Sequence, residues 1–341
     1  MNIVICGGGM VGMTLARLLR LRGQEPIVLE RMPEGAFIPR GYMLPFQGFP
    51  PLEEIGILSE LRSEGWDIAP REDGSSVAIC VQVGKILGAL ARDLPVEYGH
   101  TVTELVHDPT GRVVGVVAEG PDGMRTIPAD LVIACDGFGS PVRQMAGLDA
   151  EIEPLADAAL SFMSPEPGGV SFAMAYTSDG GHIGTLGWPE GSAGWRSCDR
   201  VGAEAALAPG VDAIKKMWVE LLPESEKAIS GVTSIDQVRY SEPSLLRCAE
   251  WWKPGVLLIG DSAHFFGPET GVSSGIGMGD AHALAEAIRQ HPDNSDAAAQ
   301  SFITWRSRVV RPYEAMDPGR QRKFTIGDRE PGPGEAWPPR S

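Results

Sequence analysis

The sequence contains no run of about 18 or more consecutive apolar residues, so a transmembrane helix is not expected. The N-terminal segment MNIVICGGGM lacks both a basic stretch and a long apolar stretch, which argues against a secretory signal peptide. Basic residues are also few: 29 Lys and Arg stand against 45 Asp and Glu, a formal net charge of −16. Nucleic acids and anionic membranes attract clustered Lys and Arg, so neither is an expected partner. We therefore expect a soluble, cytoplasmic protein.

Cysteine is also sparse, and no pair follows the CxxC spacing of metal sites and redox motifs. An odd number of scattered cysteines is typical of a reducing compartment, and it argues against a structural zinc site or another metal site. No cysteine has a neighbour that indicates nucleophilic chemistry, so burial is the expected role. The five are Cys6, Cys80, Cys135, Cys198 and Cys248.

The length of 341 residues, with 43% hydrophobic and 22% charged residues, is sufficient for two domains. The composition changes after the first 150 residues, where Gly, Pro, Ser and Trp become more frequent and segments such as VSFAMAYTS alternate. We therefore predict a mostly β domain over 151–252 with one helix at 211–222. Residues 1–150 and 253–316 would form the other, discontinuous domain. The tail over 317–341 is rich in Pro, Gly and Arg, and we expect it to be poorly ordered.

A βαβ unit is predicted at the N-terminus. NIVIC (2–6) and PIVLE (26–30) have the apolar character of buried strands, and MTLARLLRLRG (13–23) has a helical pattern that ends at a glycine. The whole unit spans about thirty residues, as a crossover unit requires. Further helices are predicted over 52–63, 83–92, 280–290 and 297–316, the last kinked before Pro312, and further strands over 100–108, 112–120, 129–137 and 255–261.

The turn between the first strand and the first helix carries the pattern GxGxxG, at Gly7, Gly9 and Gly12. With 43 glycines in the chain, roughly 0.7 such matches arise by chance, so only the context gives the pattern meaning. Here it follows a strand, opens a helix and is followed by Glu30 at the end of the next strand. Such a turn brings a pyrophosphate to the helix N-terminus, and the carboxylate accepts the ribose hydroxyls. A glycine turn without a ligand is the simpler alternative. Met10, Val11 and Arg31 flank these positions.

Two later stretches also place acidic residues at the ends of predicted strands. They are ACDGFGSPVR (134–143), with Asp136, and LLIGDSAH (257–264), with Asp261. The carboxyl ends of parallel strands face one crevice in a doubly wound sheet, so these carboxylates would meet there. Two aspartates in a crevice suit hydroxyl-bearing chains such as ribose and ribityl.

These three stretches, in this order, resemble the fingerprints of the class A FAD-dependent monooxygenases, the p-hydroxybenzoate hydroxylase family. The resemblance covers roughly 1–60, 77–150 and 250–310 and is faint between them over 151–250. It implies an α/β fold with an interrupted, Rossmann-like FAD-binding domain and a mostly β substrate domain. It also implies FAD as cofactor, NAD(P)H as co-substrate and O₂ as a reactant.

The resemblance assigns a cofactor contact to each matching position. In the family, the second stretch touches both FAD and NAD(P)H, the aspartate of the third holds the ribityl chain, and the loop after it runs along the isoalloxazine. Gln82 and, more weakly, Arg40 match residues that lie near the FAD phosphates. The loop departs from the family at Ser273 and Gly275, where Gly and Asn are usual. The implied contacts are Gly7, Gly9, Met10, Val11, Gly12, Glu30, Arg31, Arg40, Gln82, Asp136, Gly137, Arg143, Gly260, Asp261, Pro268, Gly271, Val272, Ser273 and Ser274.

The segment over 260–280 is rich in glycine although it lies between an apolar strand and a helical stretch. By the resemblance, PETGVSSG is a loop that carries backbone N–H groups to the flavin. Glycine would be needed because the backbone itself must approach a flat ring. A flexible linker fits less well at this place.

The implied reaction is hydroxylation or epoxidation of an aromatic or polyunsaturated small molecule through a flavin C4a-hydroperoxide. The chain has no second GxGxxG, which disfavours flavoproteins with two nucleotide folds, and no WxWxIP signature of flavin halogenases. The alternatives are a flavin reductase or oxidase on the same fold and a non-catalytic FAD-binding module. The substrate, the choice between NADH and NADPH and the oligomeric state are not readable from the sequence.

No general base can be chosen from the sequence. His264 belongs to the third stretch, where packing beside the flavin is the simpler role. Glu269 lies in the loop, and a solvated carboxylate is at least as good a reading. Tyr176 and His182 fall on the predicted substrate sheet together with two tryptophans, and packing is the simpler role for all of these. The tryptophans are Trp188 and Trp195.

Overall fold

The computed structural model describes most of the chain. The predicted tail, 317–341, and the side chain of Glu269 lie outside the described part. No helix among the described residues is both long enough and apolar enough to cross a membrane. The described residues are 1–37, 40–70, 76–155 and 158–315.

A six-stranded sheet forms the core of the larger part of the molecule, in the order β18-β19-β10-β1-β2-β6. Five of its strands are parallel, and the edge strand β18 is antiparallel to β19. All four residues of β1 and of β10 are buried, as expected for parallel strands covered on both faces. The strands are β1 (Ile3–Cys6), β2 (Ile27–Glu30), β6 (Val96–Tyr98), β10 (Leu131–Ala134), β18 (Trp252–Lys253) and β19 (Val256–Leu258).

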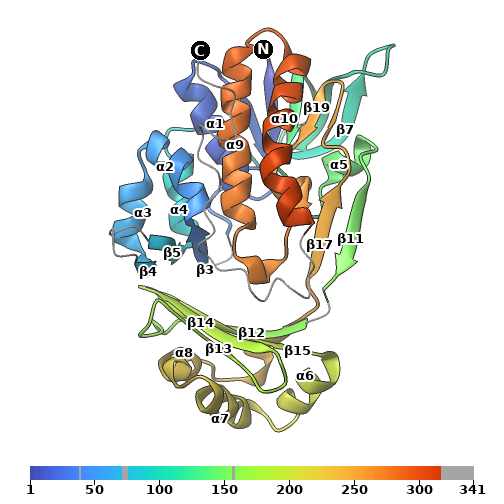
Figure 1. Cartoon of the computed structure of the whole chain (residues 1–341). Helices are drawn as coiled ribbons and strands as arrows, with labels where there is room; N and C mark the ends of the chain where they lie inside the picture. The colour runs from blue at the N-terminus through green and yellow to red at the C-terminus, as the bar shows by residue number, and fades with distance from the viewer. Residues whose placement is uncertain (38–39, 71–75, 156–157, 316–341) are drawn as a thin grey trace.

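Helices α1 (Met10–Leu21), α9 (Ser273–Gln290) and α10 (Ser295–Glu314) lie side by side along this sheet (Figure 1). The antiparallel meander β7 (Thr101–His107), β8 (Val113–Gly120) and β9 (Gly123–Pro128) contacts the sheet through β8 and β10. The predicted βαβ unit is confirmed, and the run over 255–261 does return as a parallel strand beside β10. The short hairpin partner β9 had not been predicted.

The predicted helix over 52–63 is wrong as a single helix. The chain forms α2 (Phe49–Ile55) and α3 (Leu58–Glu64), because Gly56 adopts φ 87° and ends the first of them. The helix predicted over 83–92 is confirmed as α4 (Val83–Ala91). A three-stranded sheet, β3-β5-β4, contacts α3 and α4 through β5; its strands are β3 (Gly41–Pro45), β4 (Trp66–Pro70) and β5 (Ser76–Gln82).

A second large sheet has five antiparallel strands in the order β13-β14-β15-β12-β16. One face is covered by α6 (Arg200–Leu207), α7 (Val211–Leu221) and α8 (Glu226–Ser230) (Figure 1). The prediction of one helix in this region is therefore wrong, since α6 and α8 are short and lack a long apolar repeat. The strands are β12 (Ala158–Ser164), β13 (Phe172–Tyr176), β14 (His182–Trp188), β15 (Gly191–Cys198) and β16 (Val238–Ser241).

A third sheet joins the two regions, in the order β11-β17-β20. Its strands are β11 (Ala150–Pro154), β17 (Ser244–Cys248) and β20 (His264–Phe265). The first two belong to the predicted substrate region and β20 to the predicted cofactor region. The division of the chain at 150 and 252 stays a prediction.

Helix α9 begins at Ser273, seven residues before the predicted start at 280, so much of the expected loop is helical. A β-carbon on Gly277 would lie 2.8 Å from Val11 Cγ2 and 3.2 Å from Gly260 Cα. One on Gly275 would lie 2.6 Å from Pro45 Cγ. These two glycines are thus explained by close packing of α9 and not by approach to a ring.

Candidate functional site

The glycine turn after β1 separates into two kinds of position. A β-carbon on Gly7, which has φ 112°, would collide with the carbonyl oxygen of Cys135, and one on Gly12 would collide with that of Gly7. Around Gly9 a β-carbon would meet no atom within 4 Å. The fold therefore requires glycine at positions 7 and 12. Beside Gly9, at the N-terminus of α1, open space remains. The first turn of α1 carries no acidic side chain, so this space suits a phosphate.

Glu30 ends β2 beside this turn. Its Oε2 accepts a hydrogen bond from the Gly8 amide at 2.7 Å, and its Oε1 accepts one from the Met32 amide at 2.8 Å. Both contacts fix the carboxylate at the mouth of the turn, where a ribose would lie. Arg31 is exposed, whereas Met10 and Val11 form the first turn of α1.

Asp136 and Arg143 are engaged within the protein. Asp136 accepts hydrogen bonds from the Ser140 hydroxyl and, at 3.0 Å, from the Val142 amide, and burial raises its pKa. Arg143 is buried and donates to the carbonyl oxygens of Ser262, at 2.8 Å, and Phe138, at 2.9 Å. The arginine thus joins the second sequence stretch to the third. Gly137, with φ 85°, turns the chain directly after Asp136.

Asp261 follows Gly260 directly after β19. Gly260 has φ 61°, and its amide donates to Asp280 Oδ2 at 2.9 Å. Burial, together with the negative charge of Asp280, raises the pKa of Asp261 to about 6, although His264 and Arg40 act in the opposite direction. A carboxylate held in such surroundings gains from hydroxyl donors, which a ribityl chain would supply.

Tyr42 lies at this site and was missed by the sequence reasoning, because the strand β3 had not been predicted. The guanidinium carbon of Arg40 is 6.0 Å from the centre of the Tyr42 ring. Burial and the charge of Asp261 raise the pKa of Tyr42 to about 12. The predicted candidate Gln82 lies close by, since it pairs with Gly41 of β3 in the β3–β5 register.

The loop before α9 combines a one-turn helix, η5 (Pro268–Thr270), with Gly271 in the left-handed region at φ 63°. A β-carbon on Gly271 would collide with the end of the Met43 side chain. Val272 is buried, and the Ser273 hydroxyl accepts a hydrogen bond from the Phe266 amide at 3.2 Å. The Ser274 hydroxyl is buried, and its hydrogen bond with the Tyr42 side chain acts to lower the pKa of that tyrosine. The first turn of α9 thus offers free N–H groups to a ligand.

The three candidate bases whose side chains the structure describes do not gather in one place. His264 is 1% exposed, and its Nε2 lies 2.7 Å from Asp280 Oδ2; its role as a packing residue stays a prediction. Tyr176 and His182 pair with each other at one end of the β13–β14 hairpin, and Tyr176 is 63% exposed. Trp188, at the other end of β14, packs on Gly41 of β3. Trp188 lies six positions after His182 along the strand, a distance of about 20 Å.

The second face of the five-stranded sheet is apolar and aromatic. Phe172 and Trp195 lie on it with ring centres 5.9 Å apart and ring planes tilted by 40°, and the Trp195 ring packs against Gly184 of the next strand. Met163 and Met174 are 45% and 43% exposed. This face points away from α6–α8 and towards the loop before α9 (Figure 1).

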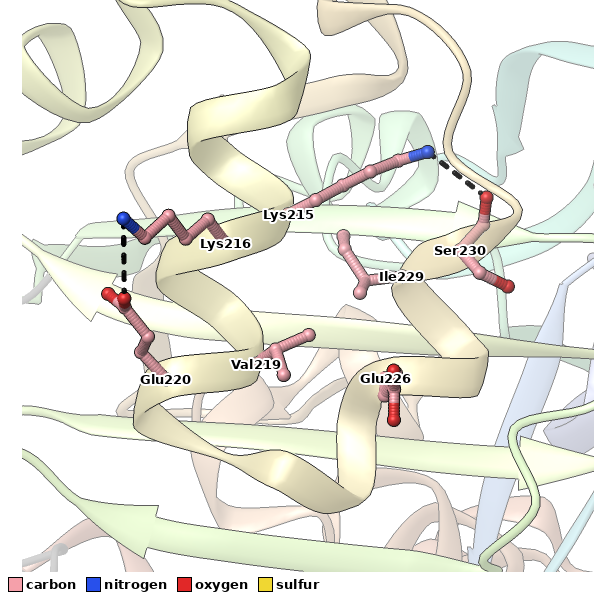
Figure 2. Close-up of a pocket in the computed structure, with 7 residues that line it drawn as sticks. All are labelled: Lys215, Lys216, Val219, Glu220, Glu226, Ile229 and Ser230. Carbon is pink, nitrogen blue, oxygen red and sulfur yellow. Dashed lines mark hydrogen bonds and ion pairs between the residues drawn. The ribbon is translucent and has the colours of Figure 1, made fainter.

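A pocket lies between α7 and α8, on the helical side of the same sheet (Figure 2). Lys215 donates there to the Ser230 carbonyl at 3.2 Å, and Lys216 pairs with Glu220 at 3.7 Å. None of the motif residues lines it. It is therefore separate from the candidate site.

The family model of the FAD binding domain matches residues 1–72 and 75–299. The chain belongs to this family. Over 171 residues, 43% of this chain, it is 29% identical to a 12-dehydrotetracycline 5-monooxygenase/anhydrotetracycline 6-monooxygenase of Streptomyces rimosus, and this match spans only 33% of that protein. It is 25% identical to 6-methylpretetramide 4-monooxygenase of Streptomyces rimosus, over 85% of this chain and 74% of that one.

Among solved structures, the fold matches that of PqsL, a probable FAD-dependent monooxygenase from Pseudomonas aeruginosa, with a TM-score of 0.77 and 19% identity. The match covers 95% of this chain and 98% of that one. The fold is therefore the p-hydroxybenzoate hydroxylase type that the sequence predicts. The protein is an FAD-dependent oxidoreductase of the monooxygenase class, and NAD(P)H is the usual co-substrate in this family.

Proposed function

We propose that this protein hydroxylates a flat aromatic small molecule that lies between the loop before α9 and the apolar face of the five-stranded sheet. The observation that carries this proposal is the pair of aromatic rings of Phe172 and Trp195, on the sheet face that points towards that loop. Flat aromatic ligands stack well on such surfaces. One relative named above is called a monooxygenase of 12-dehydrotetracycline and anhydrotetracycline and the other a monooxygenase of 6-methylpretetramide; the tetracycline names support a fused-ring substrate.

FAD would lie with its pyrophosphate beside Gly9, its adenosine ribose at Glu30, its ribityl chain at Asp261 and its ring beside residues 271–274. Bound FAD supplies the redox chemistry that activates O₂ with electrons from NAD(P)H. The open space at Gly9 and the free N–H groups at the start of α9 support this placement.

The protein's own contribution would be to orient the substrate and to exclude water from the reacting atoms. The free N–H groups at the start of α9 stabilise negative charge on a bound ring. The apolar sheet face keeps water from the reacting atoms and positions the substrate ring. Tyr42 would remain protonated at neutral pH and serve as a hydrogen-bond donor beside Asp261, because its pKa is about 12.

The test is to purify the protein, record its visible spectrum and follow NADH and NADPH oxidation in air. A panel of phenols, quinolones and fused-ring polyketides supplies candidate substrates. A yellow protein whose NAD(P)H consumption rises with a fused-ring compound supports the proposal. Reduction of a substrate without oxygen uptake would instead identify a flavin reductase on this fold.

A further inference from the structure

A buried charge cluster lies behind the segment of Gly260 and Asp261, and no step of the proposed function uses it. Asp280 is fully buried within α9, and His264 and Arg306 are 1% and 2% exposed. Asp280 Oδ2 lies 2.7 Å from His264 Nε2, and Asp280 Oδ1 accepts from Arg306 Nε at 2.8 Å.

The same carboxylate also holds the backbone of the cofactor segment. Gly260 donates its amide to Asp280 Oδ2 at 2.9 Å, in a turn that needs φ 61°. Arg306 adds a hydrogen bond to the Ile276 carbonyl at 3.1 Å, one turn before Asp280. The Asp280 carboxylate, on α9, therefore connects this helix by hydrogen bonds to η4 (Gly260–Ser262) and to α10.

The carboxylate of Asp280 is paired with the Arg306 guanidinium. A buried carboxylate is costly unless it is paired and fully hydrogen-bonded, and Asp280 meets both conditions. Although burial acts to raise the pKa of Asp280, the charges of His264 and Arg306 hold it below the usual range. The Asp280 carboxylate is thus a fixed anion, and it is hydrogen-bonded to the amide of Gly260, the residue before Asp261.

We propose that Asp280 and Arg306 are positioning residues of the FAD site: they fix the Gly260 turn, so that Asp261 projects towards the cofactor. Helix α10 is then part of the cofactor site although it contributes no residue to the ligand surface. The proposal rests on FAD binding and not on the identity of the substrate.

Arg311 on the same helix provides a matched control. Its guanidinium donates to the backbone carbonyls of Cys248, at 3.1 Å, and Ala249, at 2.8 Å, and lies 4.7 Å from the Trp251 ring centre. It does not contact Asp280 in the described structure. Arg306→Met and Arg311→Met both remove an arginine from α10, and only the first disturbs the turn.

The measurement is the dissociation constant of FAD, from quenching of flavin fluorescence, together with the melting temperature of each apo-protein. We expect Arg306→Met to weaken FAD binding tenfold or more, as the loss of one hydrogen bond to a charged group can. Arg311→Met should bind FAD within about twofold of the wild type, and Arg306→Lys should recover most of the loss. Equal FAD affinities for Arg306→Met and Arg311→Met would overturn the proposal.

Arg306→Met leaves Asp280 unpaired and can fail to fold. A second variant, Asp280→Leu with Arg306→Met, removes both charges, and such a replacement often leaves stability unchanged. It should melt close to the wild type and still bind FAD at least tenfold more weakly. A double variant that binds FAD normally, or one that does not fold, would show that the cluster has no separate positioning role. Wild-type protein without FAD binding would instead overturn the cofactor assignment itself.

Discussion

Gly9 and Gly12 lie in the same turn, yet only one of them is explained by the protein. A β-carbon on Gly12 would overlap the carbonyl oxygen of Gly7, and one on Gly9 would meet nothing within 4 Å. The glycine that the fold does not need is the one that lets a pyrophosphate approach the backbone. The fold therefore explains Gly12, and cofactor binding explains Gly9.

Gly9→Ala should therefore leave the apo-protein about as stable as the wild type and weaken FAD binding by roughly tenfold or more. Gly12→Ala should instead lower the stability of the apo-protein by about 1–3 kcal/mol, since the backbone must move. Thermal melts without FAD and fluorescence titrations with FAD check both. A destabilised Gly9→Ala protein with unchanged FAD affinity would contradict the assignment.

FAD affinity should increase as the pH rises from 5 to 7. The pKa of Asp261 is about 6 in the free protein, and hydroxyl donors from a ribityl chain stabilise the carboxylate and lower that pKa. Binding then releases a proton below pH 6, so affinity is about tenfold weaker at pH 5 than at pH 7. The comparison with Asp261→Asn isolates this group. The variant should bind FAD more weakly, with the tenfold pH change removed.

The glycines of α9 and α4 give a second matched pair. Gly277→Ala places a methyl group 2.8 Å from Val11 Cγ2, and overpacking of this kind costs about 1–3 kcal/mol. Gly88, in α4, has open space around its α-carbon, so Gly88→Ala should stabilise the protein by about 0.5–1 kcal/mol. Urea unfolding of the two variants measures both effects. Equal stabilities would mean that α1 and α9 are not closely packed.

Trp195→Ala should raise the KM for an aromatic substrate by about tenfold, because an aromatic stacking partner on this face is lost. FAD affinity and the slow NAD(P)H oxidation without substrate should stay unchanged. Leu221→Ala, on α7 at the other side of the sheet, is the control. If both variants keep the wild-type KM, the substrate does not lie against this face.

The sequence predicted the elements whose pattern is local. The βαβ unit, the glycine turn and Glu30 could be read because strand, turn and helix follow one another within thirty residues. The three-stranded sheet of β3 was missed together with Tyr42, since short strands joined by distant pairing leave no local repeat. The glycine-rich segment was taken for a loop, because the packing partners of Gly275 and Gly277 lie far away along the chain. The bond between Asp280 and Arg306 could not be predicted either, because it depends on the packing of two helices.

The most direct test of the account is to supply ¹⁸O₂ to the protein with FAD, NAD(P)H and the compound that most increases cofactor oxidation. The account predicts a product heavier by one oxygen atom, with the label in the product and the second labelled atom in water. A product without the label, or cofactor oxidation that yields only hydrogen peroxide with every compound, would contradict it.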